Sequence, residues 1–232
     1  MRILITSGGT RIPIDRVRSI TNMSRGTFGA NIAEAALEAG HELHFLAAEG
    51  SQKPFQYLWE PLKGRPNKDW HALESKVNSF RSYYRESMYK TYTDYARQLE
   101  SLLRTQSFDA VILAAAVSDY GIQPYEGKVQ SRDQLTLVLS PLPKLIHSVK
   151  EWDPRITLVG FKLLVDSTEE ALLQACRKSI RDNHCDVVVA NDLRDIQRGE
   201  HRLFIVKASS PDKASSHTSN LPHAVMHAAT HP

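Results

Sequence analysis

Met1-Arg-Ile-Leu-Ile-Thr-Ser-Gly-Gly-Thr10 opens the chain with a short β-branched run followed by a loop of small residues. The apolar run Ile3-Leu4-Ile5 is typical of a strand that is buried on both faces. In the loop Ser7-Gly8-Gly9-Thr10, bare backbone N–H groups and two hydroxyls suit the oxygens of a phosphate or carboxylate. Glycine loops after strands are as often simple tight turns, so the loop alone leaves both interpretations open.

The segments that follow complete a βαβ unit. Residues 29–39 are rich in helix formers with one apolar face, Gly40 stops that pattern, and residues 41–48 alternate before becoming apolar. Such a unit opens a doubly wound sheet. The glycine loop is therefore expected at the carboxyl end of a strand, where ligands bind in open α/β sheets.

The rest of the chain continues the alternation of strands and helices. Further strands are predicted at 108–116, 156–164, 186–192 and 201–207, an antiparallel strand at 134–140, and helices at 144–152 and 169–182. We therefore predict one α/β domain over residues 1–207, Rossmann-like, with three α/β/α layers and a mainly parallel sheet. Residues 50–105 are expected to be a divergent, largely helical segment of it, and residues 208–232 a mobile tail with at most a short Ala/His helix after Asn220.

Composition limits the function classes. The 232 residues are 41% hydrophobic, and 29 basic and 26 acidic residues are interspersed at a net charge of +3, so nucleic acid is not an expected partner. Cys176 and Cys185 lack metal-ligand spacing, which favours reduced thiols and no zinc site. No apolar run reaches about 18 residues. We expect a cytoplasmic protein without a membrane partner.

Polar residues follow several predicted strands. Asn22, Asp119, Lys128 and Asn191 offer amides, a carboxylate and an ammonium, with no Ser-His-Asp or Cys-His arrangement among them. This set suits ligands that carry phosphate. Asp119 is either a ribose or metal contact or a turn cap, and Lys128 is either a phosphate contact or a solvated surface lysine.

Two patterns leave alternatives open. The aromatic residues between Phe80 and Tyr95 either stack on bases or, as is commoner at helical spacing, pack against a sheet or another subunit. The first loop lacks both the G-x-G-x-x-G fingerprint and the Walker A pattern. An NAD(P)- or flavin-binding oxidoreductase is thereby disfavoured, and it stays an alternative together with a non-catalytic nucleotide-binding protein.

The motifs, taken together, resemble phosphopantothenate-cysteine ligases, most closely the free-standing bacterial type. The residues that carry the resemblance are Ile3–Thr10, Ile14-Asp15, Val17-Arg18, Thr21–Gly26, Ala114–Tyr120, Gly160-Phe161 and Ala190–Asp192. They occur in family order across residues 1–206, interrupted by the divergent segment 50–104.

The resemblance implies a ligase of coenzyme A synthesis that joins 4′-phosphopantothenate to L-cysteine. In that reaction the substrate carboxylate attacks the α-phosphate of a nucleoside triphosphate, usually CTP in bacteria and ATP in eukaryotic relatives, and releases pyrophosphate. The cysteine amine then displaces the nucleotide from the acyl-nucleotide. Mg²⁺ screens the triphosphate, and the family implies a homodimer.

The resemblance also implies residue roles. Asn22 is the residue that holds the acyl-nucleotide, and Lys128 is the first lysine of the family K-x-K-K loop over the phosphates. The implied nucleotide contacts are Gly8, Gly9, Thr10, Ala114, Ala115, Asp119, Lys128, Phe161 and Lys178. Ser24 and Asn191 are implied substrate contacts, and Asp119 is the implied metal contact, mostly through phosphates.

The chain departs from the family in two places. The K-x-K-K loop reads Lys128-Val-Gln-Ser131, so only its first lysine is kept. The second helix lysine of many bacterial members falls near Arg181-Asp182. Both changes leave the choice between CTP and ATP open.

Overall fold

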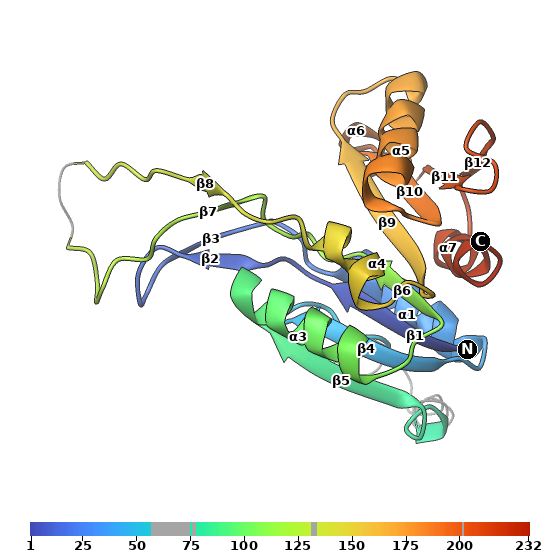
Figure 1. Ribbon diagram of the computed structural model, residues 1–232, viewed down its shortest axis with the longest axis horizontal. Coiled ribbons are helices and arrows are strands. Elements are labelled where there is room, and N and C mark those ends of the chain that lie inside the picture. The colour runs from blue at the N-terminus through green and yellow to red at the C-terminus, as the bar shows by residue number, and fades with distance from the viewer. Residues whose placement is uncertain (57–74, 76–77, 131–133, 201) are drawn as a thin grey trace, which may run out of the picture.

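The computed structural model describes residues 1–56, 75, 78–130, 134–200 and 202–232. Eight strands form one sheet in the order β12-β11-β10-β9-β6-β1-β4-β5 (Figure 1). They are β1 (Arg2–Ser7), β4 (Glu42–Ala48), β5 (Tyr84–Tyr89), β6 (Ala110–Leu113), β9 (Thr157–Leu164), β10 (Val187–Asp192), β11 (Leu203–Lys207) and β12 (Ala214–His217). Neighbours from β10 to β5 pair in parallel, and β11 and β12 add two antiparallel pairings at one edge. The predicted mainly parallel sheet is confirmed.

Helices cover both faces of the sheet, which confirms the predicted three layers (Figure 1). α1 (Thr27–Glu38) and α7 (Leu221–Thr230) bury apolar side chains on one face. The opposite face carries α3 (Tyr92–Thr105), α4 (Val149–Trp152) and α5 (Glu169–Asn183). The 3-10 helix η3 (Leu145–Ser148) precedes α4, and the short α6 (Leu193–Gln197) follows β10.

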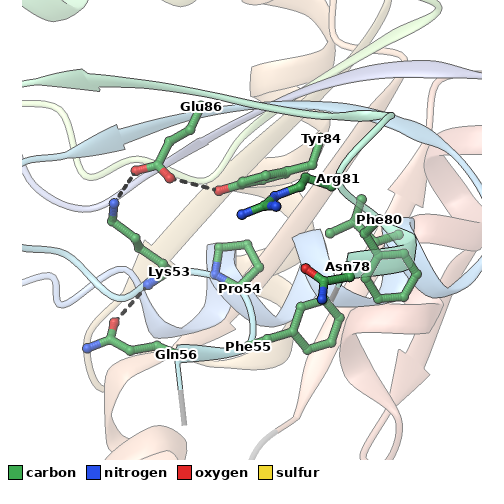
Figure 2. Close-up of a pocket in the computed structure, with 10 residues that line it drawn as sticks. Lys53, Pro54, Phe55, Gln56, Asn78, Phe80, Arg81, Tyr84 and Glu86 are labelled. Carbon is green, nitrogen blue, oxygen red and sulfur yellow. Dashed lines mark hydrogen bonds and ion pairs between the residues drawn. The ribbon is translucent and has the colours of Figure 1, made fainter. Parts of the chain in front are cut away.

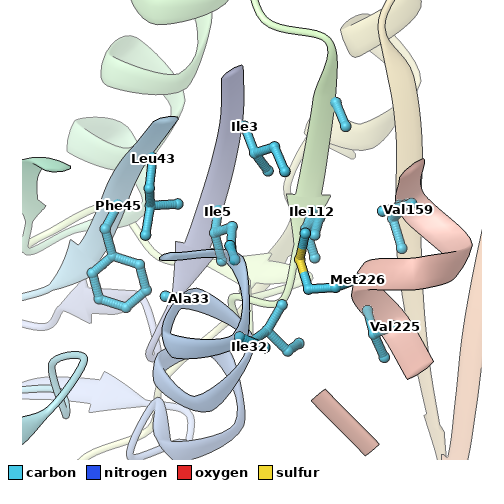
Figure 3. Close-up of a cluster of buried hydrophobic side chains, with 14 of the residues drawn as sticks. Ile3, Ile5, Ile32, Ala33, Leu43, Phe45, Ile112, Val159, Val225 and Met226 are labelled. Carbon is cyan, nitrogen blue, oxygen red and sulfur yellow. The ribbon is translucent and has the colours of Figure 1, made fainter. Parts of the chain in front are cut away.

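The central strands contribute to both hydrophobic clusters because successive side chains of a strand point to opposite faces. Ile3 and Ile5 of β1 belong to the cluster under α1 and α7, and Leu4 to the cluster on the other side. Figure 3 shows Ile3 and Ile5 with Ile32 of α1 and Met226 of α7. Burial of each side chain of this size contributes about 1.5–3 kcal/mol to the stability of the fold. The two clusters therefore hold the strand ends in place relative to one another.

An arm extends from the body of the molecule (Figure 1). It consists of the hairpin β2 (Arg11–Pro13) and β3 (Ser19–Thr21), the pair β7 (Tyr120–Gly121) and β8 (Ser140–Pro141), and their connections. The described part of the arm exposes Val17, Tyr125, Val138 and Leu139 by 44% or more.

The prediction that residues 50–105 are largely helical is wrong at β5. Tyr84–Tyr89 pairs in parallel with β4 and forms an edge of the sheet. An edge strand with exposed Arg85 and Glu86 lacks the apolar alternation of a buried strand, and its tyrosines imitate helical spacing. α3 begins only at Tyr92. Residues 57–74 and 76–77 of this segment lie outside the described residues.

The antiparallel strand predicted at 134–140 is also wrong for most of its length. Only Ser140 is paired, with Gly121. Leu135 and Val138 alternate in sequence but are 45% and 77% exposed, because this stretch runs along the arm and has no sheet face to pack on.

The structure replaces the predicted mobile tail by ordered elements, β12 and α7. β12 pairs with β11, which is therefore not the edge strand that the sequence indicates. α7 buries Val225, Met226, Ala228 and Ala229 against α1 and the sheet. These residues form an apolar stripe of helical period that the surrounding Ser, Lys and His residues obscure. The domain therefore extends beyond residue 207.

Candidate active site

A pocket of ≈ 200 Å³ lies at the carboxyl end of β6, beside β9. Its lining comes from α3, the segment after β6, the start of η3 and the middle of β9: Tyr95, Leu113, Ala115, Val117, Ser118, Asp119, Pro143, Lys144, Leu145, Ile146, Phe161 and Lys162. The structure thus brings together three predicted nucleotide contacts, Ala115, Asp119 and Phe161. Ala114 is their chain neighbour, with its N–H bonded to the Ile112 carbonyl at 3.1 Å.

Lys144 and Lys162 in this pocket were missed by the sequence reasoning. The Nζ of Lys144 lies 3.9 Å from Oδ1 of Asp119, and both side chains are more than half exposed, so this ion pair is weak. The ammonium of Lys162, which lies in β9 opposite Ala190, has no hydrogen bond or ion pair to any described residue. Two ammonium groups beside one carboxylate leave a net positive site that suits an anionic ligand. The only sequence signal for Lys162 is its place after Gly160-Phe161.

Two buried tyrosines are hydrogen-bonded to the end of β1, and Tyr95 of the two lines the pocket. Tyr95 donates to Thr6 Oγ1 at 3.3 Å and Tyr89 donates to the Ser7 carbonyl at 2.8 Å, and their rings meet edge to face. Burial raises the pKa of both phenols, so both stay neutral donors. For these two residues, packing against the sheet is the confirmed interpretation of the aromatic pattern.

The Phe161 ring packs against α1. Its centroid lies 6.1 Å from that of Phe28, with the ring planes at 78°. The residue therefore lines the pocket while its ring belongs to the hydrophobic cluster on the α1 side.

The glycine loop and Asn22 lie against the segment that leads into the pocket. Ala116 donates its N–H to the Gly8 carbonyl at 2.8 Å, and its own carbonyl accepts from Thr10 N–H at 3.1 Å and Asn22 Nδ2 at 2.7 Å. Ala116 is three positions before Asp119. Ala116 thus joins Gly8 and Asn22 to the chain segment that continues to Asp119, although Gly8 and Asn22 do not line the described pocket.

Tight packing requires the glycines of this loop. A Cβ at Gly8, whose φ is +85°, would meet the Ala48 Cβ at 2.5 Å, and one at Gly9 would meet the Asn22 carbonyl oxygen at 2.8 Å. Thr10 is fully buried, and its N–H and Oγ1 are bonded to Ala116 and Ser118. This packing is that of a tight turn with a buried Thr10, and the contacts of Gly8, Gly9 and Thr10 with a nucleotide stay a prediction.

Several predicted contacts lie away from the pocket. Lys178 on α5 is 72% exposed and pairs with Asp182 at 2.6 Å, which lowers the pKa of that carboxyl. Lys128 lies on the arm, where its neighbours bond to the β2–β3 hairpin. Ser24 precedes α1 and its Oγ accepts from Gly26 N–H at 3.4 Å.

Asn191 lies near the end of β10, opposite Leu163 of β9. The next residue, Asp192, is buried and accepts two hydrogen bonds from Ser167, from its N–H at 2.8 Å and its hydroxyl at 2.7 Å. These bonds, led by the Ser167 hydroxyl, lower the pKa of Asp192 to about 2. Asp192 is therefore ionised at neutral pH, and its carboxylate holds the loop between β9 and α5 through Ser167.

No metal-binding cluster was found among the described residues: none of their His, Cys, Asp and Glu side chains form a group of three. Asp119 offers a single, largely exposed carboxylate. That fits a Mg²⁺ ion that arrives with a triphosphate and takes most of its ligands from phosphate and water. Across the same described residues, no helix has the length and apolar character needed to span a membrane.

A second cavity of ≈ 460 Å³ lies at the β5 edge of the sheet. Figure 2 shows Glu86 of this cavity with two partners: Lys53 Nζ lies 2.6 Å from its carboxylate, and the Tyr84 hydroxyl donates to the same carboxylate at 3.2 Å. Phe55 and Phe80 stack there with centroids 5.3 Å apart. This cavity lacks the pair of lysines and the strand-end position of the smaller pocket.

Comparisons with known proteins agree with the motifs. A family model described as the DNA/pantothenate metabolism flavoprotein C-terminal domain matches residues 1–58 and 88–226. The coenzyme A biosynthesis bifunctional protein CoaBC of Thermococcus kodakarensis is 34% identical over 206 residues, which are 88% of this chain and 44% of that protein. The chain thus spans less than half the length of this relative.

A human relative and a solved structure match over more of their length. The phosphopantothenate-cysteine ligase of Homo sapiens is 30% identical over 245 residues, which cover 91% of this chain and 77% of that protein. The crystal structure of the DNA/pantothenate metabolism flavoprotein from Streptococcus pneumoniae has a TM-score of 0.78 at 29% identity, covering 98% of this chain and 97% of that one. The resemblance stated from the motifs is confirmed, and the chain belongs to the family of pantothenate-metabolism domains that includes the phosphopantothenate-cysteine ligases.

Proposed function

We propose that this chain joins 4′-phosphopantothenate to L-cysteine at the expense of a nucleoside triphosphate, as a step of coenzyme A synthesis. The observation that supports the proposal is the pocket at the carboxyl end of β6, whose lining includes Lys144 and Lys162 together with Asp119. A member of this ligase family needs such a site to bind a triphosphate beside a second anionic substrate.

In the first half-reaction, a carboxylate oxygen of phosphopantothenate attacks the α-phosphorus, and the bond to the leaving pyrophosphate breaks. Lys162 and Lys144 would bind phosphate oxygens through charge-assisted hydrogen bonds. Asp119 would hold Mg²⁺, which screens the charge of the triphosphate when it is bound. Lys128 would neutralise charge on the departing pyrophosphate, a role that its exposed ammonium, unpaired among the described residues, supports.

In the second half-reaction, the amine of cysteine attacks the acyl carbon, loses a proton and displaces the nucleoside monophosphate. Asn22 supports this step by its position. Its Nδ2 is fixed on the Ala116 carbonyl, and its Oδ1 accepts no bond from any described residue. That oxygen is available to accept an N–H from the attacking amine. Ser24 and Asn191 remain proposed substrate contacts.

The nucleotide is proposed to be CTP, with ATP as the alternative. Lys128 is the only lysine kept from the K-x-K-K loop, and Lys178 is paired outside the pocket. Neither observation distinguishes the two bases, so the proposal of CTP rests on the family resemblance.

We further propose that the protein works as a cytoplasmic homodimer. The arm exposes Val17 by 67% and Val138 by 77%, and a second copy that covers these side chains would bury them. Cys176 and Cys185 are buried free thiols, and burial raises the pKa of each to about 11, which is compatible with a reducing compartment.

The test measures both products. Purified protein is mixed with phosphopantothenate and either CTP or ATP, with and without cysteine, and pyrophosphate and the cysteine amide are quantified by coupled assay and mass spectrometry. The proposal requires pyrophosphate that depends on phosphopantothenate, and amide only when cysteine is present. Nucleotide binding without pyrophosphate would instead identify a nucleotide sensor.

A further inference from the structure

Asp15 is a buried carboxylate in the turn between β2 and β3. Its side chain has no exposed surface, although the arm around it is largely open to solvent. Oδ1 accepts from the N–H groups of Val17 and Arg18, each at 2.8 Å. Oδ2 accepts from Arg18 NH2 at 2.6 Å and from Val129 N–H at 3.0 Å. The Arg18 guanidinium, and after it the Val17 N–H, holds the pKa of Asp15 well below its usual range.

These bonds join the hairpin to the segment that carries Lys128, more than a hundred positions along the chain. Arg16 N–H donates to the Gly127 carbonyl at 3.0 Å, and Arg18 donates through its guanidinium to the Val129 carbonyl. Both neighbours of Lys128 are thus held, while the lysine side chain itself is exposed.

A carboxylate is costly to remove from water unless its acceptor capacity is used, and here both oxygens are used. A hairpin turn alone needs only local bonds, such as those to Val17 and Arg18. The bond to Val129 serves no purpose in that turn. The bond restricts the backbone next to Lys128, whose proposed role is to bind a phosphate. Positioning groups contribute to a reaction by restricting the reacting groups in this way.

We propose that Asp15 and Arg18 are positioning residues that set the backbone around Lys128 for the phosphate-releasing half-reaction. This inference rests on the proposed function through the role of Lys128. Neither Asp15 nor Arg18 is assigned a contact with substrate.

The first test is independent of activity. In Asp15→Asn, hydrogen exchange at the Val129 amide should speed up by about tenfold or more, because a charge-assisted hydrogen bond is lost. Arg16→Gln is the matched control, since Arg16 contributes only its backbone N–H to this contact, and exchange at Val129 should stay within about twofold of wild type. Unchanged exchange at Val129 in Asp15→Asn would overturn the inference.

The second test separates positioning from a merely structural role. Asp15→Asn and Arg18→Gln should each slow single-turnover pyrophosphate release, and Asp15→Asn should add less than about twofold in a Lys128→Gln background, because both changes act through the same group. A full additional effect in that background would show that Asp15 does not act through Lys128 and would overturn the proposal.

Failure of the proposed function is distinguishable from failure of this inference. If wild-type protein releases no pyrophosphate, the ligase proposal fails and the positioning role fails with it, whereas the exchange data still report whether Asp15 restrains the segment. If wild-type protein is active and the double-mutant result is additive, only the positioning inference fails.

Discussion

Lys162→Gln should impair nucleotide use more than any other lysine substitution outside the arm. The ammonium of Lys162 lines the pocket and has no ion-pair partner among the described residues, so in the free protein it is available to a phosphate. A charge-assisted hydrogen bond contributes about 1.5–3 kcal/mol, a factor of about 10 to 150. Because the pocket is open to solvent on one side, we expect the lower part of this range, about 10- to 30-fold in kcat/KM for the nucleotide.

The matched control is Lys178→Gln. The family resemblance implies that Lys178 on α5 contacts the nucleotide. In the structure its side chain is 72% exposed and paired with Asp182 at 2.6 Å, outside the pocket. Initial rates of pyrophosphate release at varied nucleotide should change by less than about twofold for this variant, as for most exposed substitutions. The reasoning is refuted if Lys178→Gln shows the larger loss and Lys162→Gln behaves like wild type.

Three further outcomes are expected. Asn22→Ala should retain pyrophosphate release while amide formation slows by about 100-fold, as on removal of a positioned polar group, and equal slowing of both half-reactions in rapid-quench assays would remove Asn22 from the second step. Met226→Ala should lower the free energy of unfolding in urea by about 2–5 kcal/mol, because Met226 is only 4% exposed; a mobile tail would give no change. Burial lowers the pKa of His44, whose Nδ1 has no hydrogen-bond partner among the described residues. Below pH about 6.5 the unfolded chain therefore binds more protons than the folded one, and the free energy of unfolding should fall by up to about 1.4 kcal/mol per pH unit. In His44→Leu this pH dependence of the free energy of unfolding should vanish. If urea titrations at pH 5 and pH 7 give the same difference for His44→Leu as for wild type, His44 is excluded as its source.

The buried strands of this fold were predictable because a short, continuous apolar run is explained only by a strand that is covered on both faces. Ile3-Leu4-Ile5 has side chains on both faces of the sheet, and only a strand covered on both sides buries all three. β5 was not predictable in this way, since an edge strand with Arg85 and Glu86 needs no apolar alternation. α7 was predicted at most as a short Ala/His helix of a mobile tail, because the Ser-, Lys- and His-rich stretch before it gives no sign that Val225, Met226, Ala228 and Ala229 are buried.

The candidate site was predictable where residues adjoin strand ends and unpredictable where tertiary contacts decide. Ala115 and Asp119 lie two and six positions after the end of β6, so their place at this edge of the sheet could be inferred from the strand. Lys162 and Lys144 reach the same pocket from different elements, which periodicity cannot reveal. Thr10 had the residue type of a phosphate contact, but its bonds to Ala116 and Ser118 turn it inward.

The central proposal is that the pocket of Lys144, Lys162 and Asp119 binds the triphosphate, and that Asn22 meets the acid beside it. A crystal structure of the protein with a non-hydrolysable CTP analogue and phosphopantothenate tests it most directly. The account predicts phosphate oxygens within hydrogen-bond distance of Lys162 and the substrate carboxylate beside Asn22. Nucleotide density in the cavity between Phe55, Phe80 and Glu86, with the Asp119 pocket empty, would contradict it.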